Sequence, residues 1–241
     1  MVAAERVFTD PQVIALANAA RDGNVDRIAA LIRAGANVRA VGEKGFTLPH
    51  FALYARQNAP QVMVALLKAG ADPVSMLADG ENVPTYAVER DNADPEVVKV
   101  LLDNGIDPNW RPPASNIFNE TSLLQSAIGG HNLPVIKLLV QRGADINYVH
   151  PVSGSALHYA LNGSDFFMAA FLVESGIDLS LKNMTSPRIK NPLAVSRTAI
   201  EKFCRFQGGK RGANPLPRIA EGWAAFTTAL AKRGVTMPCG L

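Results

Sequence analysis

The sequence predicts an all-α protein built as a solenoid, in which about five pairs of antiparallel helices stack side by side. One motif recurs five times, an apolar helix that ends at a glycine, in Val25–Val38, Gln61–Pro73, Val97–Asn109, Leu133–Asn147 and Met168–Leu179. The glycines that end these helices are spaced by 35, 35, 38 and 33 residues. A period near 33 is typical of tandem units that each contain two helices and a turn.

The copy at Leu133–Asn147 shows why the motif folds locally. Its valine, leucine and isoleucine side chains recur at helical spacing, and Gly143 can end the helix in the left-handed conformation. Asp145 and Asn147 then favour a turn. Similarity among the five copies therefore indicates core packing, and function is expected where the copies differ.

A second motif precedes four of the five copies. It occurs as Thr47–Ala52, Val83–Ala87, Thr121–Ala127 and Ser155–Ala160. In combination with the glycine-ended helix it resembles the ankyrin repeat, whose signature is T-P-L-H-x-A followed by a second helix and G-A-D-x-N. The resemblance covers about Gln12 to Leu179 and implies paired helices joined by β-turn fingers, the connections that lead from one repeat into the next.

We expect one domain over residues 1–241, because an array with a continuous core has no internal boundary. The amino-terminal capping repeat is predicted at 12–40, and further repeats at 41–75, 76–109, 116–147 and 152–180. A degenerate capping repeat at 187–238 should close the carboxyl-terminal end, with an insertion around Phe206–Leu216.

Helix boundaries can be predicted in several of these units. Asp10 should cap a first helix that starts at Pro11 or Gln12 and ends at Asp22, and Val25–Ala34 should form the next helix. Asp94 followed by Pro95 is a further start signal, and Arg218–Gly234 is expected to be the last helix and its stop.

The histidines at 50 and 158 fall at the signature histidine, for which the resemblance implies a structural role at the helix start. The alternative of a catalytic base or metal ligand is not favoured, because no partner acid or nucleophile lies nearby in a recognisable pattern. In the third unit we assign Tyr86 to the place of the histidine.

Composition limits the class of protein. With 48% hydrophobic and 19% charged residues, the chain has enough apolar material for a core and is not expected to be disordered. The first twelve residues are too polar for a cleaved signal peptide, and no run of about 18 apolar residues occurs. We therefore expect a cytoplasmic protein, or one exported without such a signal, and no membrane partner.

No catalytic or metal-binding pattern is apparent. The four histidines are scattered, and Cys204 and Cys239 lack metal-ligand spacing. The segment Gly208–Gly212 lacks the spacing of a phosphate-binding loop. We expect no cofactor, no small-molecule substrate and no enzymatic activity.

The longest connection between repeats is the strongest candidate for partner binding. It spans Asn109–Glu120 and contains Trp110, Arg111 and Phe118, while the adjacent Pro-Pro pair stiffens it. Trp110 could contact a partner or fold back onto a neighbouring repeat. The other predicted partner-binding residues lie in fingers and are Tyr148, His150, Lys44 and Glu81; for His150 the alternative is an imidazole simply exposed to solvent.

Basic residues gather near the carboxyl-terminal end. Between Pro187 and Arg218 there are eight basic residues and one acid, a net charge of +7 in a chain whose net charge is +3, so the rest is near −4. The predicted basic patch comprises Arg188, Lys190, Arg205, Lys210 and Arg211. It is either a solvated face of the cap or a contact for an acidic protein or nucleic acid.

The resemblance therefore implies a non-catalytic module that binds one protein partner through its fingers and first helices. The compact, alanine-rich chain looks more like a bacterial ankyrin protein than part of a large scaffold. One role is an immunity or antitoxin protein that covers a toxin's active site. The alternatives are an effector or adaptor that engages a host or signalling protein, and a nucleic-acid contact through the basic end, which is the less favoured of the two.

Overall fold

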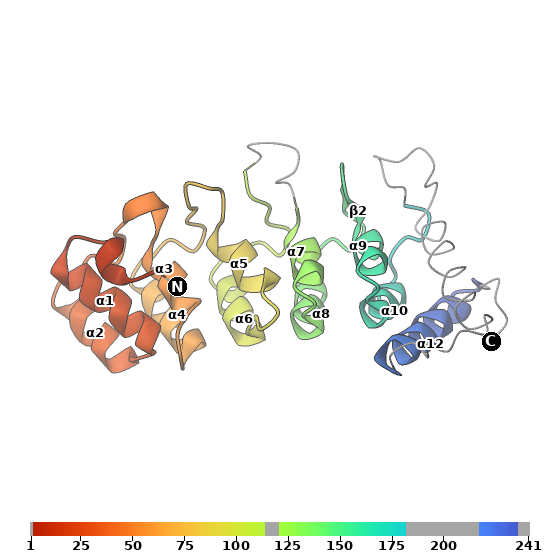
Figure 1. Ribbon diagram of the computed structural model, residues 1–241, viewed down its shortest axis with the longest axis horizontal. Coiled ribbons are helices and arrows are strands. Elements are labelled where there is room, and N and C mark those ends of the chain that lie inside the picture. Colours follow the sequence, from red (N-terminus) through yellow and green to blue (C-terminus); the bar gives the residue numbers. More distant parts are fainter. Residues whose placement is uncertain (1, 114–120, 182–216, 236–241) are drawn as a thin grey trace, which may run out of the picture.

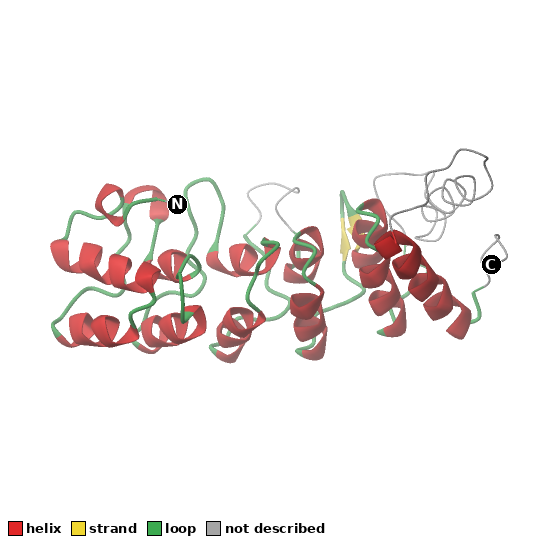
Figure 2. Ribbon diagram, turned by 60° about the horizontal axis from the view of Figure 1, so that its bottom comes forward, coloured by secondary structure: helices red, strands yellow, loops and turns green. Residues whose placement is uncertain are grey.

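The computed structural model describes residues 2–113, 121–181 and 217–235. The chain forms a row of helix pairs (Figure 1). The inner layer contains α1 (Pro11–Asp22), α3 (Leu48–Ala52), α5 (Val83–Glu89), α7 (Leu123–Gly129) and α9 (Ala156–Asn162). The outer layer contains α2 (Val25–Arg33), α4 (Ala59–Lys68), α6 (Pro95–Asp103), α8 (Leu133–Gln141) and α10 (Phe166–Glu174). Figure 2 shows the two layers from a second direction, and the predicted helical solenoid is confirmed.

The helices start where the sequence places their caps. The Asp10 carboxylate accepts a hydrogen bond from the Gln12 N–H at 2.8 Å, and α1 begins at Pro11. The Asp94 carboxylate accepts one from the Glu96 N–H at 2.9 Å, directly before Pro95. Such caps satisfy backbone donors that have no partner inside the helix, so these starts depend on local chemistry alone.

The five repeat-ending glycines share one backbone conformation. Their φ angles lie between 90° and 97°, a region that side chains with a Cβ rarely adopt. After each glycine the chain turns back on the helix it has left; for example, the Ile106 N–H donates to the Leu101 carbonyl at 3.1 Å. The glycine period in the sequence is therefore a period in the structure.

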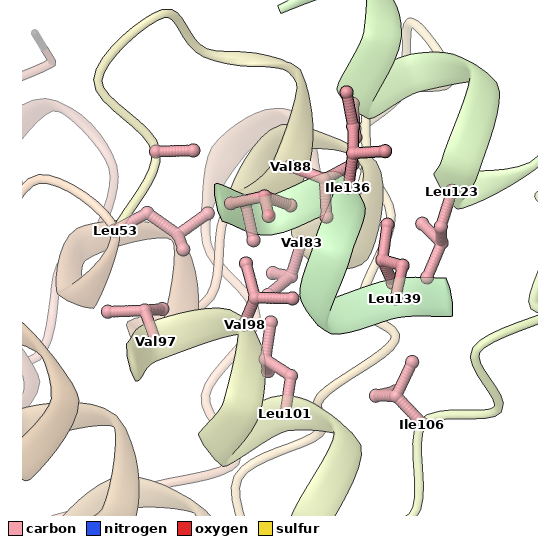
Figure 3. Packing of buried hydrophobic residues seen from close by; sticks show 14 of the residues in the cluster. Leu53, Val83, Val88, Val97, Val98, Leu101, Ile106, Leu123, Ile136 and Leu139 are labelled. Carbon is pink, nitrogen blue, oxygen red and sulfur yellow. The ribbon is translucent and has the colours of Figure 1, made fainter. Parts of the chain in front are cut away.

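The buried apolar side chains form one connected cluster from Ala4 to Leu230. Figure 3 shows a part of this cluster, where Val83 of α5 and Val98 of α6 pack together near Ile136 and Leu139 of α8. Each repeat completes its core only with side chains of its neighbours. Stability is consequently shared between repeats.

The carboxyl-terminal end is covered by α12 (Pro217–Lys232), which packs against α10. The Trp223 ring meets the Phe166 ring edge to face, with 4.9 Å between centroids, and Phe226 is fully buried. The helix ends at Lys232 and is followed by Gly234, whose φ is 73°, which confirms the predicted last helix and its stop. The first part of the predicted capping repeat, residues 187–216 with the predicted insertion, lies outside the described residues.

The fingers that the structure describes project from the same side of the row (Figure 1). One of them is a hairpin of β1 (Val149–His150) and β2 (Gly154–Ser155), which pair antiparallel. Another contains the 3-10 turn η2 (Glu43–Gly45), and its Lys44 carbonyl accepts from the Ala78 N–H of the next finger at 2.8 Å. These two neighbouring fingers are thus bonded to each other.

Side chains just after the outer helices connect successive repeats. The Asn109 side chain donates to the Gly143 carbonyl at 3.1 Å and accepts from the Asp145 N–H at 2.6 Å. The Asn147 side chain accepts from the Asp178 N–H at 2.8 Å. Arg39, at the same place in the first unit, donates to the Gly70 carbonyl at 3.0 Å. In the second unit this place is occupied by Val74, which cannot make such a bond.

Candidate functional site

A groove of about 620 Å³ crosses the inner face of three successive repeats. We call it the inner groove. It is bordered by the finger before α5, by the inner helices α5, α7 and α9, and by the ends of the long connection. Its lining residues are Asp79, Gly80, Glu81, Asn82, Thr85, Tyr86, Glu89, Arg90, Pro112, Thr121, Gln125, Ser126, Gly129 and Tyr159.

The inner groove carries three carboxylates. Asp79, Glu81 and Glu89 form no ion pair with any side chain in the described parts of the chain. Burial raises the pKa of the Glu81 carboxyl, and the nearby charges of Asp79 and Glu89 raise it further. The groove therefore presents negative charge for which the described residues supply no ion-paired counterion.

Arg90, the cation among the described lining residues, is already engaged. Its guanidinium donates to the Leu53 carbonyl at 2.6 Å and lies 4.7 Å from the centroid of the Tyr54 ring. These contacts hold it beside α3, so it does not neutralise the carboxylates by a direct ion pair.

The walls of the inner groove are held by buried hydrogen bonds. The Asn82 side chain caps α5 by accepting from the Thr85 N–H at 2.9 Å. The Gln125 amide, which is almost fully buried, donates to the Gly154 carbonyl of the next finger at 2.6 Å. A ligand would therefore meet a surface that is largely ordered beforehand.

The structure corrects the assignment of Tyr86. Helix α5 is capped by Asn82, so its third residue, which corresponds to the signature histidine, is Thr85. Tyr86 lies one position later, at the place of Phe51 and Tyr159 in other repeats. Its side chain lines the inner groove instead of bonding to the helix start.

The structural role of the two signature histidines is confirmed. The His50 Nδ1 accepts from the Thr47 N–H at 3.2 Å, and the His158 Nδ1 accepts from the Ser155 N–H at 3.1 Å. Burial lowers the pKa of His50 to about 4 and also lowers the pKa of His158. Both imidazoles are consequently neutral at pH 7.

Two of the predicted partner-binding residues lie together. The Arg111 guanidinium stands 4.7 Å from the centroid of the Tyr148 ring, although the residues come from different fingers. Trp110, next to Arg111, is half-buried and packs against the core cluster. Its side chain therefore covers the adjacent repeats, which was the alternative considered for this residue.

His150 differs from what we expected. It is only 2% exposed, and its Nδ1 accepts from the N–H groups of Val152 and Ser153, each at 3.1 Å. The expectation of an imidazole exposed to solvent was wrong, because the hairpin folds around the ring. His150 shapes its finger from within and does not offer a side chain to a partner at the surface.

Lys44 and Glu81 are exposed. They lie in two neighbouring fingers, which are joined by the hydrogen bond from the Ala78 N–H to the Lys44 carbonyl. Phe118 and the basic patch of Arg188, Lys190, Arg205, Lys210 and Arg211 lie outside the described residues.

Sequence reasoning missed most of the inner groove. Tyr86 and Tyr159 stand at equivalent positions in their repeats, and an alignment of the repeats by their capping residues reveals this equivalence. Asp79 and Glu89 carry no such signal, because they meet only when the finger before α5 folds beside that helix.

Among the residues of the described ranges, no three histidine, cysteine or acidic side chains are grouped so as to hold a metal ion. Within the same ranges, no helix combines the length and apolar character needed to cross a bilayer.

The stacked helix pairs, the left-handed glycines and the histidine caps define a helical repeat protein with a hollowed inner face. Residues 85–183 match the family model for ankyrin repeats, in three copies. Residues 85–183 are therefore an ankyrin-repeat region. Comparison with curated proteins found no match.

Proposed function

We propose that this protein is a non-catalytic binding module that holds one protein partner at the inner groove and the neighbouring fingers. Ankyrin repeats generally mediate protein–protein interaction. The observation that carries the proposal is the groove of about 620 Å³, which three successive repeats build together. A recess of this kind on a surface held by buried hydrogen bonds can bind with little ordering cost.

The charge of the groove favours a partner segment with lysine or arginine side chains. A cation placed between Asp79, Glu81 and Glu89 would supply the counterion that the described residues do not provide. The same carboxylates disfavour nucleic acid at this site, because they repel phosphates. The Arg111 and Tyr148 pair offers a further contact on the fingers.

We propose the role of an immunity or antitoxin protein in the cytoplasm, which inhibits its partner by covering the partner's active site. A rigid, acidic recess is suited to such stoichiometric occlusion. The alternative is an effector or adaptor that binds a regulatory protein and leaves its active site open. A nucleic-acid contact through the basic patch is a separate alternative, and would show a steep loss of affinity as salt is added.

The test is a pull-down from the source cells with the full chain as bait, followed by mass spectrometry. Wild type is compared with Glu89→Lys, which reverses a charge in the groove, and with Glu96→Lys, which reverses one on the outer helix α6. We expect a partner that is retained by wild type and Glu96→Lys and lost with Glu89→Lys. Equal recovery by all three would rule out the inner groove as the binding site.

The purified partner then separates the roles. An inhibitor should abolish the partner's activity at a one-to-one molar ratio, whereas an adaptor should bind at the same ratio and leave that activity intact. Thermal unfolding of each variant checks that lost binding does not reflect lost folding.

A further inference from the structure

A second recess lies beside the inner groove on the same face, and we call it the aromatic pocket. It has a volume of about 220 Å³ and is lined by Val2, Arg21, Phe46, His50, Phe51, Tyr54, Leu77, Glu81 and Tyr86. Glu81 and Tyr86 line the inner groove as well, so the two recesses adjoin.

Rings form much of the wall of the aromatic pocket. Phe46 meets His50 edge to face at 5.6 Å between centroids, and it meets Phe51 in the same manner at 6.4 Å. The rings of Tyr54 and Tyr86 are 5.9 Å apart. Sites for drug-sized ligands have volumes of about 300–1,000 Å³, so this smaller pocket fits a single large side chain.

One residue of the pocket wall, His50, also carries a hydrogen-bond donor that has no acceptor in the described parts of the chain. His50 is 4% exposed, and because its Nδ1 accepts the Thr47 N–H, the proton of the neutral ring is on Nε2. That Nε2 has no hydrogen-bond partner among the described residues. The Arg21 Nε, in the same wall, is also buried without a partner there.

Comparison with the fourth repeat explains why the His50 Nε2–H finds no acceptor in the following finger. Gln125 stands at the equivalent position and donates to the Gly154 carbonyl of the following finger at 2.6 Å. The carbonyl equivalent to Gly154 belongs to Glu81, and it accepts from the Leu77 N–H of its own finger at 2.6 Å. A buried donor that has no acceptor favours binding of a ligand that brings one.

We propose that the aromatic pocket binds a tyrosine side chain of the protein partner, next to a lysine or arginine that enters the inner groove. The phenol ring would pack against the aromatic wall, and its hydroxyl oxygen would accept a hydrogen bond from His50 Nε2–H, an atom that is covered in the unbound structure and must be uncovered as the ring enters. Phenylalanine lacks the acceptor, and tryptophan carries only a donor. The adjoining carboxylates of Glu81 and Glu89 account for the basic neighbour. This inference rests on the proposed function, since it names the chemistry of the partner at the same face.

The experiment uses blocked, fluorescently labelled pentapeptides with a central tyrosine, phenylalanine or alanine flanked by lysines, and a tyrosine peptide flanked by glutamates. Affinity for the full chain is measured by fluorescence polarisation. We expect the lysine-flanked tyrosine peptide to bind about tenfold more tightly than the phenylalanine peptide, the ratio that one buried hydrogen bond supplies. The lysine-flanked alanine peptide and the glutamate-flanked tyrosine peptide should bind more weakly still. Equal affinities for tyrosine and phenylalanine, or no binding of any peptide, would overturn the proposal.

Substitutions locate the site. Leu77→Trp fills the pocket from a finger position and should abolish tyrosine-peptide binding, whereas Val74→Trp, which adds the same group outside both recesses, should leave it unchanged. If Leu77→Trp fails to fold, the peptide series on wild type still decides. In the pull-down, a partner lost with Glu89→Lys and retained with Leu77→Trp would refute the tyrosine pocket and leave the proposed function standing.

Discussion

The Arg111 guanidinium lies over the Tyr148 ring, 4.7 Å from its centroid, and so links the long connection to the hairpin finger that follows it. Both residues were predicted as partner contacts from their separate positions in the sequence. Their stacking orients the guanidinium before any partner arrives, which lowers the entropy lost on binding.

Replacing Tyr148 with alanine should free the Arg111 side chain. We expect the affinity for the partner found in the pull-down to fall, while the free energy of unfolding decreases by only about 0.5–1 kcal/mol, since the pair is partly exposed. Tyr148→Phe keeps the ring and serves as the control, with affinity close to wild type. Isothermal titration calorimetry gives the affinities, and equal values for all three proteins would remove this pair from the binding surface.

The buried histidines should make folding stability depend on pH. Burial lowers the pKa of His50 from its ordinary value of 6.5 to about 4, so the unfolded chain binds more protons between these values. Stability is therefore present above pH 6.5 and is lost as the pH falls toward 4, by about 3 kcal/mol for this residue. His158 contributes in the same direction.

Urea unfolding at pH 7 and pH 4.5 measures this loss. His50→Gln provides the control, because glutamine occupies the equivalent position at 125 and does not titrate. The variant should lose less stability than wild type between the two pH values. The same loss in both proteins would contradict the assignment to His50.

The side-chain bond that is missing at Val74 can be added. Val74 is 40% exposed, and in the next unit Asn109 donates to the Gly143 carbonyl from this place. We expect Val74→Asn to bond to Gly105 and to raise the free energy of unfolding by about 0.5–1.5 kcal/mol. The reciprocal change Asn109→Val should lower it by a similar amount. Chemical denaturation checks both, and a destabilised Val74→Asn would show that the repeats meet differently here.

The packing of α12 on α10 should protect the carboxyl-terminal end of the array. Trp223→Ala removes a ring that is 2% exposed, and such truncations cost about 3–5 kcal/mol. Because repeats stabilise their neighbours, α10 should lose protection first and α1 last. Hydrogen exchange measured by mass spectrometry follows each helix. Uniform loss of protection along the chain would indicate that the array unfolds as a single unit.

The parts of the fold that sequence predicted well are those set by local chemistry. Asp10 and Asp94 cap helices through a carboxylate two residues away from the donor, and Gly143 ends one by its own backbone conformation. Such features require no knowledge of the neighbouring repeat. The last helix was predictable for the same reason, since Gly234 marks its end.

The candidate site was harder to predict because it depends on register and on stacking. The proline at 84 suggested a repeat entry one residue away from the true cap at Asn82, and this shift placed Tyr86 at the helix start instead of in the groove. His150 is buried by a hairpin that the sequence pattern did not indicate. The carboxylates of the groove meet only when a finger folds beside its helix.

The absent bond at Val74 also bears on the mechanics of the array. Flanking repeats are joined by Arg39, Asn109 and Asn147, so the junction between the second and third repeats has one crosslink fewer than its neighbours at this position. That junction separates most of the aromatic pocket from most of the inner groove. Because this junction has fewer side-chain bonds at this position, it should bend more readily than its neighbours. A small rotation here would change the distance between the two recesses. The array could thereby adjust that distance to the spacing of two side chains on a partner.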